Sequence, residues 1–247
     1  MVLKVIKKHK IKSILFIIPV GITVYVLFLI MSNNFKAPLK PTDKVSISST
    51  VISDSDFLDA VKFGSANNVR NMLEVGANPN AVDQNGRNAM SIAATFRSSP
   101  ELIKVLKEYK VDINHKDVNG YTPLMLAILA SSSENFVDTL ISYGANVNST
   151  TNTGTSVLMM ALALGNNNIK VIESLIKHGA NLNYKTPHNV TPLMIALKSS
   201  NNPKLIELLL KSGAKANAKD DLGISTADIL KSNHSLSNNS SLKQKIH

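Results

Sequence analysis

The stretch Tyr121-Thr122-Pro123-Leu124-Met125-Leu126-Ala127 has the features of a helix N-terminus. Thr122 provides a side-chain acceptor for the first unpaired N–H groups, and Pro123 suits the first helical position, where an N–H is not needed. Leu124 and Ala127 then fall on one face of the helix. Together with this stretch, related triplets recur at spacings of 34, 34, 35 and 34 residues, and they are Asn88-Ala89-Met90, Ser156-Val157-Leu158, Thr191-Pro192-Leu193 and Ser225-Thr226-Ala227.

A second marker, with the pattern Gly-Ala-Asn-x-Asn, has the same period. Its copies are Gly76-Ala77-Asn78-Pro79-Asn80, Gly144-Ala145-Asn146-Val147-Asn148, Gly179-Ala180-Asn181-Leu182-Asn183 and, less regularly, Gly213-Ala214-Lys215-Ala216-Asn217. Lys110-Val111-Asp112-Ile113-Asn114 occupies the remaining slot without a glycine. Each glycine follows an apolar helical run, which predicts a left-handed residue that ends a helix. The repeating unit is therefore helix, loop, helix, glycine and extended finger, and such units bury their apolar faces only by stacking.

These residues resemble those of ankyrin-repeat proteins. The resemblance depends on the run from Asp117 to Leu124, on Thr191-Pro192-Leu193 and on the Gly-Ala-Asn-x-Asn endings, and it covers Asp54 to Lys231. It implies an all-α ankyrin-repeat solenoid of stacked helix-loop-helix units with short β-hairpin fingers, which binds other proteins. One difference is that Met125 and Met194 replace the histidine that often follows Thr-Pro-Leu in the family, so a buried polar network is lost. The surplus over the family's usual repeat length falls in polar inter-helix loops, where it costs little.

The composition argues against catalysis and against nucleic-acid binding. The chain has no cysteine, which excludes disulfides and thiolate metal sites, and its six histidines form no ligand pair. No glycine-rich nucleotide loop is present, and five of the ten net positive charges lie in residues 1–12 without a basic stripe elsewhere. We therefore expect no enzyme activity, no cofactor, no metal and no nucleic-acid partner. Asp83, Asp117 and Asp220 recur at one repeat position, and we expect each to bond the neighbouring finger's backbone.

The N-terminal region has the pattern of a membrane anchor. Residues 1–12 carry five lysines and no acid, and residues 13–32 form an uncharged apolar run of nearly the length that crosses a bilayer. We predict a transmembrane helix there, with a cleavable signal peptide and secretion to the periplasm as the alternative. The lysines place the N-terminus in the cytoplasm. The repeats would then lie on the periplasmic, extracytoplasmic side of an inner (plasma) membrane.

The remaining segments follow from this division. Residues 33–53 form a polar linker, and residues 54–231 form the repeat domain, with an N-terminal cap repeat, four fuller repeats and a C-terminal half-repeat. Residues 232–247 form a polar tail in which Leu242 and Ile246 allow either a short capping helix or disorder. We expect the array to be monomeric.

Two functions fit this layout. The first is a membrane-tethered scaffold for an unidentified protein partner, and the alternative is a structural or regulatory subunit of a membrane complex that is recognised through its transmembrane helix. For the scaffold, family register predicts binding from the finger tips and the inner side of the first helices. Arg87 and Tyr121 are the expected anchors, projecting from the fingers and burying little. Phe96, Leu129 and Leu164 form an exposed apolar row if they face the groove, and the alternative is that Leu129 and Leu164 turn into the core. The full set of candidate binding residues is Gln84, Asn85, Arg87, Phe96, Val118, Asn119, Tyr121, Leu129, Asn152, Thr153, Thr155, Leu164, Pro187, His188, Val190 and Lys198.

Overall fold

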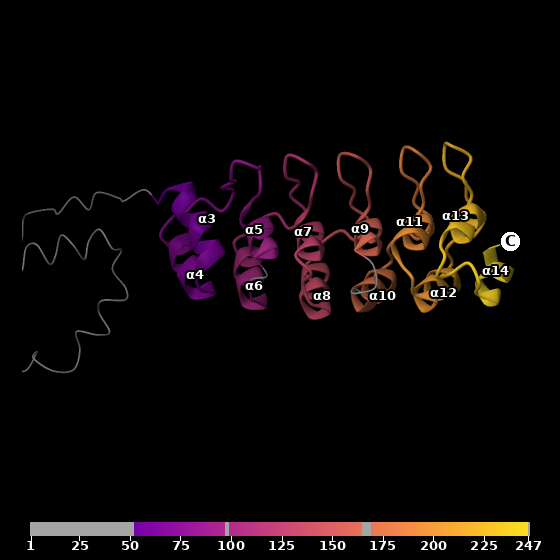
Figure 1. The fold of residues 1–247 in the computed structure, drawn as a ribbon. Coiled ribbons are helices and arrows are strands. Elements are labelled where there is room, and N and C mark those ends of the chain that lie inside the picture. The colour runs from indigo at the N-terminus through magenta and orange to yellow at the C-terminus, as the bar shows by residue number, and fades with distance from the viewer. Residues whose placement is uncertain (1–51, 97–98, 165–168, 247) are drawn as a thin grey trace, which may run out of the picture. The chain divides into compact units, whose positions relative to one another are not determined.

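The repeats form two layers of short antiparallel helices, with a finger between successive units (Figure 1). The computed structural model describes residues 52–96, 99–164 and 169–246. The expected basic segment, transmembrane helix and nearly all of the linker lie outside these residues. The first helices are α3 (Asp54–Phe63), α5 (Ala89–Thr95), α7 (Pro123–Leu129), α9 (Val157–Ala163), α11 (Pro192–Ser199) and α13 (Thr226–Ser232). The second helices are α4 (Ala66–Glu74), α6 (Pro100–Glu108), α8 (Glu134–Ser142), α10 (Ile169–Lys177) and α12 (Pro203–Lys211).

Each of the recurring triplets begins a helix as predicted. The Thr122 hydroxyl accepts the Met125 N–H, Pro123 is the first residue of α7, and Asn88, Ser156, Thr191 and Ser225 cap their helices in the same way. The serines at 65, 99 and 133 cap second helices. At these helix N-termini, a local side chain therefore satisfies a backbone N–H that has no partner within the helix.

The predicted helix stops are confirmed. Gly76, Gly144, Gly179 and Gly213 all have φ between 83° and 103°, and Lys110, which stands in the slot without glycine, has φ 59°. After α8, the N–H of Ala145 returns to the carbonyl of Leu140 and the N–H of Gly144 to that of Ile141. This pattern closes the last helical turn and turns the chain toward the next finger.

The apolar core runs continuously from Phe57 to Ile246 along the array. The first helices pack on one another in order, and because they lie between the second helices and the fingers, α5, α7 and α9 are buried along almost their whole length. The second helices bury one face and expose the other. Residues Thr50 to His247 form one compact unit that contains the whole of this core.

The fingers are tight turns rather than the predicted β-hairpins. Isolated antiparallel bridges pair Val82 with Asn88, Thr150 with Ser156 and Lys219 with Ser225, and no longer strand forms among residues 52–96, 99–164 and 169–246. The expectation that the aspartates bond the neighbouring finger is wrong. A carboxylate oxygen of Asp117 accepts N–H groups from Asn119 and Tyr121 of its own finger, because those amides converge on it inside the turn.

Adjacent units are joined at the finger bases by asparagine side chains. The Asn148 amide donates to the carbonyl of Gly179 (3.1 Å), and its oxygen accepts the N–H of Asn181 (2.8 Å). Asn114 and Asn183 make the same pair of bonds to their next units. The asparagines at 114, 148 and 183 thus each link two adjacent repeats.

The C-terminal tail forms a helix, α14 (Ser240–Ile246), which packs against α12 and α13. Leu242 and Ile246 of α14 and Leu236 before it are buried, so the tail covers the apolar end of the stack. None of the helices in the described part of the chain is long and apolar enough to cross a membrane.

A candidate partner-binding face

An exposed apolar row follows the ends of the first helices. Phe96, Leu129 and Leu164 are 44%, 44% and 39% exposed, so the alternative that places them in the core is wrong. The reason is that each of these helices ends one residue after its last core residue. In α7, for example, Ile128 is fully buried whereas Leu129, the next residue, turns outward. Lys198 occupies the same place in α11 and is exposed.

Phe63 extends this row by one repeat, and the sequence analysis missed it. It is 75% exposed at the end of α3, with its ring centroid 6.4 Å from that of Phe96 at an interplanar angle of 52°. The Lys62 ammonium lies 4.7 Å and 4.8 Å from the two ring centroids, which is cation–π distance. The spacing of 33 residues between Phe63 and Phe96 was the available signal. We call Phe63, Phe96, Leu129 and Leu164 the apolar strip.

The predicted finger residues divide into two groups by burial. The tip residues are all exposed, and they are Gln84, Asn85, Val118, Asn119, Asn152, Thr153, Pro187 and His188. The residues that follow each turn are half-buried, and they are Arg87, Tyr121, Thr155 and Val190. The structure therefore brings the predicted set to one side of the array, as tips and as a half-buried row between the tips and the strip.

Arg87 and Tyr121 do not project freely, contrary to expectation. The Arg87 side chain is 25% exposed and its guanidinium lies 2.7 Å from the Asp83 carboxylate, while Tyr121 packs against the core. Burial raises the pKa of Asp83, but hydrogen bonds from the Arg87 side chain and from the N–H groups of Arg87 and Asn85 outweigh it. The pKa of Asp83 therefore lies below its ordinary value. Arg87 therefore helps to close its own finger, and only part of its side chain faces solvent.

Tip-to-tip hydrogen bonds connect successive fingers, except at one junction. The backbone N–H of Val118 donates to the carbonyl of Asn85, and the N–H of Asn152 donates to the carbonyl of Asn119. In the last pair of fingers, the N–H of Asp221 donates to the carbonyl of His188. Pro187 occupies the donor position of the fourth finger, and a proline has no N–H. Its ring lies against Gly154 instead, where an added Cβ would be 2.6 Å from Pro187 Cδ.

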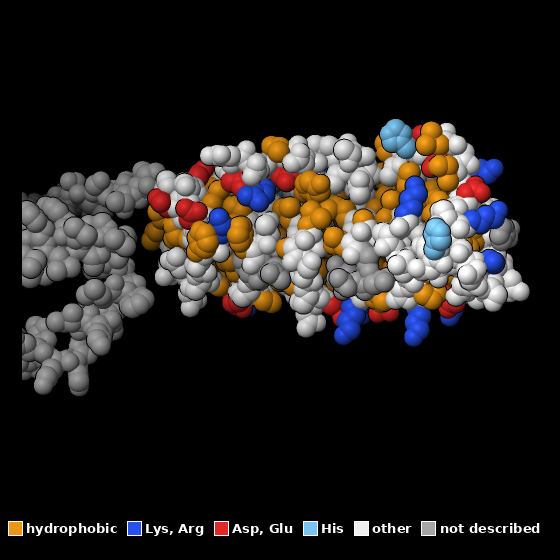
Figure 2. Space-filling model, viewed as in Figure 1, with side chains coloured by type: hydrophobic (Ala, Val, Ile, Leu, Met, Phe, Trp, Pro, Cys, Tyr) orange, Lys and Arg blue, Asp and Glu red, His pale blue; other side chains and the backbone are white. Residues whose placement is uncertain are grey.

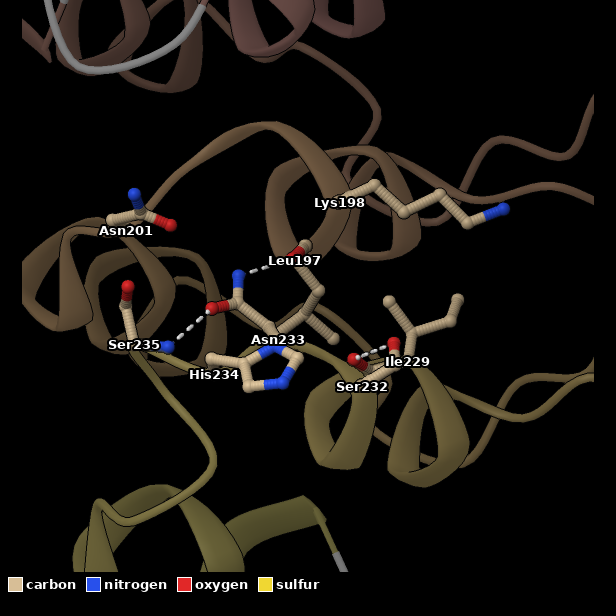
Figure 3. Close-up of a pocket in the computed structure, with 8 residues that line it drawn as sticks. All are labelled: Leu197, Lys198, Asn201, Ile229, Ser232, Asn233, His234 and Ser235. Carbon is tan, nitrogen blue, oxygen red and sulfur yellow. Dashed lines mark hydrogen bonds between the residues drawn. The ribbon is translucent and has the colours of Figure 1, made fainter.

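A hollow of about 390 Å³ lies between α11 and α13, beside the last member of the exposed row (Figure 3). Asn233 forms one wall: its amide donates to the carbonyls of Leu197 and Ser200, and its oxygen accepts the N–H groups of Ser235 and Leu236. Its other walls include Lys198, Asn201 and His234. The hollow is polar, in contrast to the apolar strip that leads toward it.

Charge changes sign along the array. Residues 52–150 contain eleven Asp or Glu and eight Lys or Arg, whereas residues 151–246 contain five acids and eleven lysines. Figure 2 shows hydrophobic side chains over the first helices, between the fingers and the second helices. The described residues contain no group of three or more histidine, aspartate or glutamate side chains that could hold a metal ion. This face thus offers contact area and charge to a macromolecule.

Comparison with known proteins supports the fold inferred from the repeats. The profile for ankyrin repeats (3 copies) matches residues 57–151 and 129–220. Among solved structures, the ankyrin repeat domain of Bcl-3, described as a unique member of the IkappaB protein family, superposes with a TM-score of 0.66 at 24% identity. That match covers 74% of this chain and 80% of the other. A comparison with curated protein sequences found no match.

Proposed function

This chain belongs to the ankyrin-repeat family, and we propose that it is a membrane-tethered scaffold that holds another protein against its apolar strip and fingers. Ankyrin repeats generally mediate protein–protein interaction. The exposure of the apolar strip carries the proposal. Four large exposed apolar side chains at the ends of successive first helices are a surface that a soluble domain rarely keeps without a partner.

Affinity capture with strip variants tests the binding surface. We expect the double variant Phe96→Ser/Leu129→Ser to lose the partner that the tagged wild-type chain captures, as identified by mass spectrometry. Val75→Ser is the matched control, because Val75 is 74% exposed at the end of α4, outside the strip. Equal loss in the control, or full capture by the double variant, would reject the strip as the binding surface.

The half-buried anchors need a separate test. Arg87→Ala and Tyr121→Ala together should weaken capture, since Arg and Tyr are frequent energetic centres of interfaces. Because both side chains also support their fingers, thermal unfolding must be measured alongside capture. Leu164→Ser should leave the unfolding temperature nearly unchanged, and marked unfolding would return Leu164 to the core.

The tether is supported by the uncharged run at residues 13–32 and by the five lysines before it. These features favour a single-pass anchor with a cytoplasmic N-terminus and repeats on the extracytoplasmic side. Protease added to cells with an opened outer envelope should digest the repeats. Protection of the repeats until the inner membrane is lysed would reverse this topology.

The same uncharged run favours one alternative, a subunit of a membrane complex recognised through its transmembrane helix. A chain that lacks residues 1–49 distinguishes the two functions, because residues Thr50–His247 form one compact unit that contains the core. Retained capture of the partner by this folded fragment supports the scaffold. Loss of capture with an unchanged circular dichroism spectrum supports the subunit.

A further inference from the structure

The apolar strip has a cation at its C-terminal end. The first exposed large side chain beyond the last core residue of each first helix is Phe63, Phe96, Leu129 and Leu164 in the first four units and Lys198 in the fifth. Leu129 and Lys198 come one residue after that core residue, and the other three come two residues after it. The change is abrupt, because all four side chains before Lys198 are large, apolar and at least 39% exposed. A ligand that follows the strip therefore meets an ammonium group after Leu164.

The surroundings of Lys198 reinforce this change. The hollow beside it is lined by the amides of Asn201 and Asn233, the imidazole of His234 and the hydroxyl of Ser235 (Figure 3). Residues 151–246 have a surplus of lysines, whereas residues 52–150 have a surplus of acids. An acidic group is thus attracted to the C-terminal end of the face and repelled from the other end.

The N-terminal end of the strip has a different chemistry. The Lys62 ammonium lies over the ring of Phe63 and also over the ring of Phe96, so it covers one face of each ring. Its charge is already engaged with two rings, and the acids of α3 are close in sequence. This end therefore offers aromatic surface rather than a free cation.

We propose that the strip binds a partner segment with two unequal halves, one apolar against Phe63 to Leu164 and one acidic against Lys198 and the polar hollow. This inference rests on the proposed function and specifies the partner. Five repeats at helix spacings of about 8–10 Å give a strip of roughly 35–40 Å. A helical segment of about 25 residues spans that length.

The test uses labelled synthetic peptides and the fragment of residues 50–247, which contains the complete core. Two 25-residue peptides share a half rich in Leu and Phe and carry either Glu or Lys in the other half. Each peptide is made in both chain directions, because the charges do not fix the direction of binding. Fluorescence anisotropy should show that the better Glu peptide binds at least tenfold more tightly than either Lys peptide.

Two lysine variants locate the preference. Lys198→Glu should remove it, with about a tenfold loss for the Glu peptide, whereas Lys204→Glu should change binding less than about twofold. Lys204 is a matched control, since it is an exposed lysine in the first turn of α12, on the other helix layer. Circular dichroism verifies that both variants are folded.

The failures of this inference and of the proposed function differ. Equal binding of the Glu and Lys peptides, or equal effects of the two lysine variants, would overturn the inference that half of the partner segment is acidic. If Phe96→Ser still abolishes binding in that case, the strip remains a protein-binding surface. Unchanged binding in Phe96→Ser rejects the strip itself. Lack of binding by every peptide up to about 100 µM also overturns the inference, because an affinity below that range is too weak to define a partner.

Discussion

The helix stack and the fingers are stabilised by different interactions. The stack depends on apolar side chains that are almost completely removed from water, such as Leu124, Ile128 and Leu140. The fingers contain few core residues and depend on backbone N–H groups that donate to single side-chain oxygens, such as the Asp117 carboxylate and the Thr151 hydroxyl. Burial of a large side chain contributes more than one half-exposed hydrogen bond. The stack therefore carries the stability of the array, and the fingers can vary in sequence while they keep their shape.

Removing a stack side chain should have the largest effect. Leu140→Ala leaves a cavity between α8 and its neighbours, and we expect a loss of about 2–5 kcal/mol in urea unfolding of residues 50–247. Leu129→Ala removes a side chain of the same size that is 44% exposed, so its loss should be less than about half as large. Similar losses for the two variants would show that the apolar strip belongs to the stack.

Substitutions at the boundary between stack and finger should change the free energy of unfolding by an intermediate amount. Gly144 has φ 101°, and nothing lies within 4 Å of an added Cβ, so Gly144→Val adds backbone strain without a clash. We expect a loss of about 1–2 kcal/mol. The reciprocal change, Lys110→Gly at φ 59°, should gain up to about 1 kcal/mol in the same assay. A loss in both variants would mean that side-chain contacts, rather than φ, set these energies.

The asparagine bonds between units should contribute less. Asn148→Ala removes two hydrogen bonds at exposed atoms, and we expect a loss of about 1 kcal/mol in the free energy of unfolding. Asn135 is exposed on α8, and Asn135→Ala should change stability by less than about 0.5 kcal/mol. A loss near that of Leu140→Ala would place the unit-to-unit bonds on a par with the core.

Acid should have the smallest effect, and we expect it in the first finger, which the Asp83 carboxylate closes. The pKa of Asp83 is depressed in the folded chain, so its stabilisation is complete above the ordinary value of 3.8 and is lost as the pH falls through the folded value. The stability difference between wild type and Asp83→Asn should shrink as the pH falls from about 6 to about 3. Thr151→Val should give a difference that does not depend on pH in this range, because a hydroxyl closes the third finger.

The elements of the fold could be predicted from the sequence because their signals are local. The caps at Thr122 and Ser156 and the left-handed glycines are encoded within a few residues, and the structure confirms them. The bonds from Asn148 to Gly179 and from Val118 to Asn85 join residues about one repeat apart. Such bonds depend on how one unit sits on the next, which no local pattern specifies.

The candidate face was only partly predicted, because it too depends on geometry that no local pattern specifies. Register placed Phe96, Leu129 and Leu164 on one line, but their exposure depends on where each helix ends. Phe63 was missed because the cap repeat was interpreted only for its core. The burial of Arg87 was missed because its pairing with Asp83 requires the closed turn, whose geometry the spacing alone does not provide.

The junction between the third and fourth fingers, at Pro187, is the weakest in the row of fingers. Bonds between tips join the first three fingers into one group and the last two into another, while the junction between the groups has ring packing against Gly154. Packing has little directional preference, so it resists sliding less than a linear N–H···O bond does. Under a force that pulls the finger tips apart, the two groups would separate at the Pro187 junction before any hydrogen-bonded junction opened. The spacing of the finger tips would then change in one step.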